Sequence, residues 1–208
     1  MAENCCSNKE SEMAGLASRQ AFVLWIVLII NAVMFFAEFL FGWLSNSTAL
    51  IGDSLDMLGD ALAYGSSIYV VNRSLDHKIT ASRFKAYLMI FLGVLVFSRA
   101  LYRFVFQVVP EVEIMAVVGL IALVANVICL ALLTRHKDDD INFASVWICS
   151  RNDIIANSGV LLAAFFVYYF EISWPDVLIG LVITILFLRS ALGILKEARA
   201  QKEGITQS

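Results

Sequence analysis

Charged residues and histidines are scarce in this sequence. Only 16% of its 208 residues are charged and 60% are hydrophobic, whereas an average soluble domain is about 25% charged and about 45–50% apolar. Neither of the two histidines, His77 and His136, lies inside a long apolar run. These shortages exclude an ordinary soluble globular protein and favour a chain embedded in lipid.

The sequence lacks the residue combinations that several classes of function require. No nucleophile, base and orienting group recur together, and no glycine loop could cradle a phosphate, so the chain is not expected to be an enzyme. Nothing in the sequence indicates a nucleic-acid partner. Two of the four cysteines lie in the polar N-terminal tail and two in apolar runs, so a framework of disulfides is not expected.

Long apolar runs follow one another along the chain. A bilayer-spanning helix needs about 20 such residues, and six runs of this kind can be counted. These are Ala21 to Leu44, Thr48 to Val71, Phe84 to Val109, Ile114 to Thr134, Ile141 to Phe170 and Pro175 to Leu195. The sequence therefore predicts an all-α, polytopic membrane protein with six transmembrane helices.

The placement of basic residues predicts the topology. Lysines and arginines cluster in the tails and in the connections around residues 72–83 and 135–140, whereas the connections at 45–47, 110–113 and 171–173 contain none. Because basic loops stay in the cytoplasm, both termini are expected there. The first run is too long for a signal peptide and should remain as a helix. The expected parts are a tail at 1–20, a transport domain at 21–195 and a tail at 196–208.

Three carboxylates interrupt the second apolar run, in the segment "ALIGDSLDMLGDAL". An acid at the centre of a spanning helix costs about 2.5–3.5 kcal/mol. On a helix, Asp53, Asp56 and Asp60 fall within an arc of about 60°, so all three would look into one place. Asp53 lies near the start of its span and could sit in an outer vestibule.

The fifth run carries a matching polar face. Cys149, Asp153 and Asn157 recur every four residues and therefore stack along one side of a helix. In an antiparallel pair of helices, Asp56 would lie near the level of Asp153, and Asp60 near that of Cys149. Converging carboxylates repel one another unless a cation or protons lie among them.

A bound divalent cation would explain these acids. Oxygen donors with one sulfur suit a transition metal such as zinc, although cadmium, cobalt, manganese and iron stay open. The alternative is that the polar groups only join helices through hydrogen bonds. Asn31 and Glu38 share a face of the first helix, and Glu38 could be an outer-shell acid, a proton carrier or the partner of Arg99.

The two polar segments resemble those of the cation diffusion facilitator family. "STALIGDSLDMLGDAL" is similar to that family's second-helix pattern, and "SRNDIIANSGVLLAA" to its fifth-helix pattern. The resemblance covers residues 20 to 200. It implies that Asp56, Asp60 and Asp153 are metal ligands, with Cys149 where the family usually has His or Asp, and with Asn157 as a possible substitute.

The resemblance also implies function and location. Expected is export of a zinc-like cation from the cytoplasm by metal/proton antiport and alternating access, without a resident cofactor, in a bacterial inner membrane. The chain lacks the family's C-terminal cytoplasmic domain, so a short form is expected. A homodimer is also implied, and the small residues of the second run would allow close helix contacts. The alternatives are a cation channel without proton coupling, or a membrane subunit that does not transport.

Overall fold

The computed structural model describes residues 18–70, 75–134 and 141–206, and these residues form six helices. The helices are α2 (Ser18–Leu44), α3 (Thr48–Val70), α4 (Leu75–Phe106), α5 (Val112–Thr134), α6 (Ile141–Phe170) and α7 (Trp174–Thr206). No strand occurs in this described part. The all-α prediction is thus confirmed.

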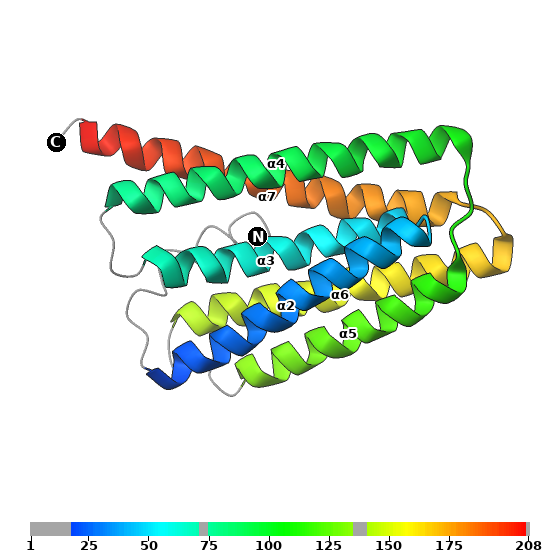
Figure 1. Ribbon diagram of the computed structural model, residues 1–208, viewed down its shortest axis with the longest axis horizontal. Coiled ribbons are helices and arrows are strands. Elements are labelled where there is room, and N and C mark those ends of the chain that lie inside the picture. Colours follow the sequence, from blue (N-terminus) through cyan, green and yellow to red (C-terminus); the bar gives the residue numbers. More distant parts are fainter. Residues whose placement is uncertain (1–17, 71–74, 135–140, 207–208) are drawn as a thin grey trace.

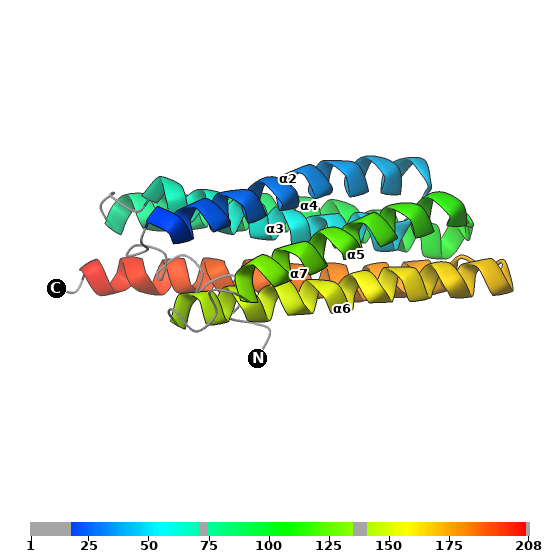
Figure 2. The same ribbon diagram turned by 90° about the horizontal axis from the view of Figure 1, so that it is seen from below.

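The helices lie side by side and alternate in direction (Figure 1). Three turns, at 45–47, 107–111 and 171–173, meet at one end of the bundle, called here the turn end. The start of α2 and the end of α7 lie at the opposite end. Figure 2 shows α6 and α7 on one side of the bundle and α2, α3 and α4 on the other.

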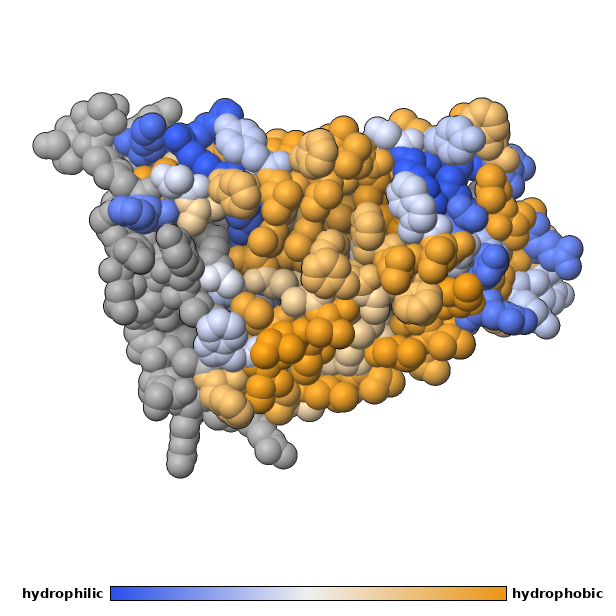
Figure 3. Space-filling view, in the orientation of Figure 1, coloured by the Kyte–Doolittle hydropathy of each residue, from blue (hydrophilic) through white to orange (hydrophobic). Residues whose placement is uncertain are grey.

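The surface between the two ends is broadly apolar. Five helices contain stretches long and apolar enough to cross a membrane, and the exception is α3, which carries three carboxylates. Large hydrophobic side chains such as Phe36, Phe91 and Phe165 are exposed. The face drawn in Figure 3 shows a wide hydrophobic band between more hydrophilic ends. The chain is an integral membrane protein, as its composition predicted. A hydrophobic surface of this extent would be unfavourable in water and is covered by lipid in a membrane.

Each of the three turns at the turn end contains one residue with a left-handed backbone. These residues are Asn46 (φ 55°), Gln107 (φ 47°) and Glu171 (φ 53°). In the second turn, the N–H of Gln107 donates to the carbonyl of Arg103 (2.8 Å), which ends α4 as an αL cap does. The predicted end of this helix at Val109 was therefore three residues too late.

Two of the helices extend by more than five residues beyond the apolar runs that predicted them. α4 begins at Leu75 rather than Phe84, and α7 continues to Thr206 rather than ending at Leu195. Both extensions are rich in charged residues. The apolar run marks the part of a helix that lies in lipid, whereas hydrogen bonding continues the helix into water.

α3 lies at the centre of the bundle. It packs extensively against α2 and α7, less against α4 and only lightly against α6. Gly52 faces the backbone of Gly180, and Gly59 faces the ring of Phe187. These two glycines thus allow close helix contacts within the chain, as expected for small residues of the second apolar run.

Candidate cation site

The acids of α3 lie at different degrees of burial. Asp53 is 1% exposed and Asp60 is 5% exposed, while Asp56 is half-buried. Asp53 and Asp60 therefore face the interior of the bundle and not lipid, as expected for acids on the central helix. The free-energy cost of burying carboxylates therefore falls on the interior face of α3.

The polar face of α6 is only partly described. Asp153 is half-buried and Asn157 is fully buried. The amide nitrogen of Asn157 donates to the backbone carbonyl of Asp153 (3.0 Å), and its oxygen has no partner among the described residues. Cys149 lies within α6, but its side chain is outside the part of the chain that the structure describes.

Acids from three helices come within electrostatic range of one another. Glu38 of α2 lies within electrostatic range of Asp53 and Asp56 of α3 and of Asp153 of α6. That Asp56, Asp60 and Asp153 share one metal site stays a prediction. The sequence had named Glu38 only as a candidate for this region.

α5 contributes two buried groups that the sequence reasoning did not place in this region. Cys129 is buried and lies within electrostatic range of Asp60 and Asp153. Asn126 is buried too, and its amide nitrogen has no partner among the described residues. Their spacing of three residues in an otherwise apolar helix was the available signal, since it puts both on one helix face.

These groups gather without converging on one point. Within residues 18–70, 75–134 and 141–206, no three His, Cys, Asp or Glu side chains lie close enough together to hold a metal ion. Like charges at short distance repel strongly in a low dielectric. The described acids therefore lie in one region without forming a metal-binding cluster.

Two of the buried acids have no hydrogen-bond partner in the described structure. Both carboxylate oxygens of Glu38 and both of Asp53 are unpaired, although Glu38 is 0% exposed. Arg99, one expected partner of Glu38, instead donates to the side-chain oxygen of Asn46 (3.3 Å) and lies over the ring of Trp43 (3.9 Å). Pairing with Arg99 is therefore not the role of Glu38 in this structure.

A second group of buried polar residues lies at the turn end, around the first turn of α3. The hydroxyl of Ser47 accepts from the N–H of Leu50 (3.1 Å), which makes Ser47 the N-cap of α3. The carboxylate of Asp176, on α7, accepts from the N–H groups of Thr48 (2.7 Å) and Ala49 (3.0 Å) and from the Ser47 hydroxyl (2.6 Å).

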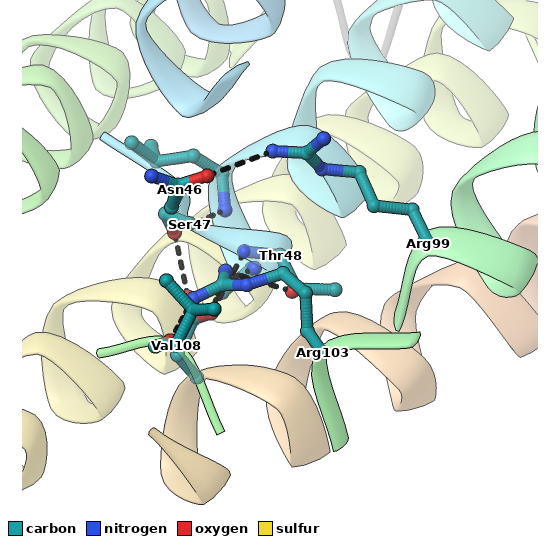
Figure 4. Close-up of polar contacts among 9 residues, drawn as sticks. Asn46, Ser47, Thr48, Arg99, Arg103 and Val108 are labelled. Atoms are coloured by element: carbon teal, nitrogen blue, oxygen red, sulfur yellow. Dashed lines mark hydrogen bonds and ion pairs between the residues drawn. The ribbon is translucent and has the colours of Figure 1, made fainter. Parts of the chain in front are cut away.

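The cation that balances Asp176 comes from α4 (Figure 4). Nη1 of Arg103 lies 3.1 Å from Oδ2 of Asp176 and donates to the hydroxyl of Thr48 (3.1 Å). Its Nη2 donates to the carbonyl of Val108. We call Ser47, Thr48, Arg103 and Asp176 the capping cluster. Asp176 and Arg103 were not singled out from the sequence, because nothing in their local sequence shows that they meet.

Comparisons with known proteins agree with this architecture. The chain is 28% identical to the metal cation efflux system protein CzcD of Cupriavidus metallidurans, over 84% of this chain and 61% of that protein. It is 24% identical to the cadmium, cobalt and zinc/H(+)-K(+) antiporter of Bacillus subtilis, over 83% and 61%. The zinc transporter ZitB of Yersinia pestis is 25% identical, over 84% and 60%.

The chain thus spans about three fifths of the length of these relatives. Their names describe efflux or transport rather than enzymes, and their organisms are bacteria, in agreement with the sequence predictions of a non-enzyme in a bacterial inner membrane. The family model of the cation efflux transmembrane domain matches residues 24–201. The chain therefore belongs to the cation efflux family, also called the cation diffusion facilitators.

Proposed function

We propose that the chain carries a divalent transition-metal cation, zinc or a similar ion, across the membrane. The observation that carries this proposal is the burial of Asp53 and Asp60 on the central helix, within a bundle whose outer surface is apolar. Such acids are expensive inside a membrane and usually mark an ion pathway. The names of the relatives, which include zinc and cadmium transport, support the same cargo.

Asp56, Asp60 and Asp153 are the proposed ligands of the transported cation. Cys149, Asn157 and Asp53 are further candidate donors from the same two helices. A tetrahedral zinc ion needs four donors, and the three proposed ligands with one of these candidates would supply them, as oxygen donors with at most one sulfur. Because like charges repel, we expect the acids to stand apart until a cation lies between them.

Exchange with protons is the proposed coupling. A carboxylate must lose its proton to hold a metal, so metal binding releases protons and protonation releases metal. An inward proton gradient would then drive the cation out of the cytoplasm. We further propose that the turn end faces outward, because its connections lack Lys and Arg, and that two copies assemble as a homodimer.

Flux measurements on protein reconstituted in vesicles would test this function. The uptake of zinc, cadmium, cobalt, manganese and iron would be followed at two imposed pH gradients, together with the vesicle pH. We expect uphill movement of zinc that follows the pH gradient and is lost in Asp60→Ala. The matched control is Glu113→Gln, which changes an exposed acid at the start of α5 and should leave the flux unchanged.

The outcomes separate the proposed antiporter from its alternatives. Zinc that moves only downhill, at a rate independent of the pH gradient, would indicate a cation channel. Absence of both zinc flux and zinc binding in the purified protein would favour a membrane subunit that does not transport. Coupled flux that survives Asp60→Ala at the same rate would contradict the proposed ligands.

A further inference from the structure

The first turn of α3 is capped mainly by another helix. A helix begins with N–H groups that have no partner within the helix, and a carboxylate at that position also interacts favourably with the helix dipole. In α3, Asp176 accepts from the N–H groups of Thr48 and Ala49, although it lies 128 residues from Thr48 in the chain. The start of α3 is therefore fixed to the start of α7.

Close contact between backbones also holds the start of α3 against the start of α7. A Cβ atom on Gly180 of α7 would lie 2.6 Å from the carbonyl carbon and oxygen of Thr48, and one on Gly52 would lie 3.1 Å from the carbonyl oxygen of Gly180. The two helices thus touch through their backbones within the first two turns of each. Neither can slide or rotate here without breaking the capping contacts.

The capping cluster holds the first turn of α3, the helix that carries the proposed ligands Asp56 and Asp60. With a rise of 1.5 Å per residue, Asp56 lies about 12 Å and Asp60 about 18 Å along α3 from Thr48. A rigid helix transmits a displacement of its first turn to these positions. The depth and rotation of the α3 acids relative to Asp153 therefore depend on how the first turn is held.

The capping cluster is shielded from solvent. Asp176 is 0% exposed and Arg103 is 2% exposed. Along α3, Asp53 and Asp60 are also buried, whereas Asp56 keeps part of its surface accessible. A displacement of α3 would therefore move acids that differ in their access to solvent.

We propose that Asp176 is a positioning residue for cation binding. Through the N–H groups of Thr48 and Ala49, it holds α3 at the depth and rotation that let the α3 acids share a cation with Asp153. This inference rests on the proposed function, because it assigns a role within the same cation site. Asp176 itself does not touch the cation.

Hydrogen exchange tests the contact itself, without any need for transport. Peptides that cover residues 45–55 would be followed by mass spectrometry in purified wild-type protein, Asp176→Asn and Glu113→Gln. We expect the amides at the start of α3 to exchange about tenfold faster or more in Asp176→Asn, because the carboxylate acceptor is lost. Glu113→Gln, an exposed acid in the first turn of α5, should match wild type. Unchanged exchange in Asp176→Asn would overturn the inference.

Zinc transport kinetics test the positioning. In vesicles, Asp176→Asn is expected to raise the half-saturating zinc concentration by about three- to tenfold, because displaced ligands bind less tightly, while the maximal rate per folded protein changes less. Asp176→Glu, which keeps the charge, should recover part of the affinity. A role in stability alone would lower the amount of folded protein and leave the half-saturating concentration unchanged, and that result would overturn the inference.

A double variant separates the two partners of Asp176. If Asp176 serves only to balance Arg103, then Asp176→Asn combined with Arg103→Met should restore both exchange and zinc affinity, which would overturn the inference. We expect both defects to persist. If Asp176→Asn yields too little folded protein, Ser47→Ala makes the same test, because Ser47 joins Leu50 to Asp176. Wild-type protein without zinc flux would refute the proposed function, whereas exchange would still report the contact.

Discussion

Two regions of buried ionisable side chains lie against or on the central helix α3 and differ in how many hydrogen bonds these side chains make. In the capping cluster, Asp176 accepts four hydrogen bonds, from the backbone of α3, from Ser47 and from Arg103. Deeper in the bundle, Glu38 and Asp53 are as well buried, yet all four of their carboxylate oxygens are unpaired within the described structure. The helix α3 thus lies between a carboxylate that is fully hydrogen-bonded and two carboxyl groups that have no hydrogen bond within the described structure.

This difference separates stability from function. A buried charge that is fully hydrogen-bonded can hold helices in one arrangement, and removing one member of such a pair is strongly destabilising. A buried charge without a partner costs stability and persists where a ligand uses it. The capping cluster is accordingly the region that fixes the helices and positions the proposed site, and the acids in the middle of α3 belong to the proposed transport region.

The largest effect on stability is expected from removing the ion pair of the capping cluster. Arg103→Met should lower the free energy of unfolding by about 3 kcal/mol, since it leaves Asp176 buried without its cation. Thermal unfolding of the detergent-solubilised protein measures this, with Arg199→Met, an exposed arginine of α7, as a control within about 0.5 kcal/mol of wild type. Equal melting of Arg103→Met and wild type would mean that the ion pair contributes nothing.

Breaking the transport region should affect flux far more than folding. Asp153→Ala is expected to reduce zinc transport by about 100-fold, which corresponds to about 2.7 kcal/mol, because a proposed ligand is lost. Zinc added at about 100 times its dissociation constant should stabilise the wild type by about 2.7 kcal/mol. This protection should be weaker in Asp153→Ala. Full protection of the variant by zinc would exclude Asp153 as a ligand.

Backbone packing at the capping cluster gives an intermediate effect. Gly180→Ala would place a methyl group 2.6 Å from the backbone of Thr48, and overpacking of this kind costs about 1–3 kcal/mol. In the matched control Gly65→Ala, the new atom would meet only a side-chain carbon of Leu28, at 3.7 Å. Melting temperatures of the two variants would be compared. Equal stability would show that α3 and α7 can separate here without cost.

The smallest expected effect is a gain in stability, in contrast to the losses expected at the capping cluster. Glu38→Gln removes a buried charge that has no hydrogen-bond partner in the described structure, so it should raise the free energy of unfolding by about 1 kcal/mol while it weakens zinc binding. Thermal unfolding without metal and calorimetric zinc titration measure the two changes. A loss of stability would show that Glu38 is satisfied in the protein as it exists in the membrane.

The sequence predicted much of the fold because bilayer thickness leaves a direct mark on it. All six apolar runs became helices. The ends of α4 and α7 were misjudged, since an apolar run measures the lipid-facing part of a helix and not its full length. The ligand assignment of Asp56, Asp60 and Asp153 stays a prediction, and the side chain of Cys149 lies outside the described residues.

By itself, the sequence determined that this chain crosses a membrane several times and places acids on its second and fifth apolar runs. Both features follow from local patterns, namely run length and helical spacing. Only the tertiary structure decided which buried charges are paired. Asp176 and Arg103 are 73 residues apart in the chain and meet because α3, α4 and α7 pack together, whereas Glu38 and Asp53 meet no such partner among the described residues. Local spacing carries no record of which distant helix will supply a counter-charge.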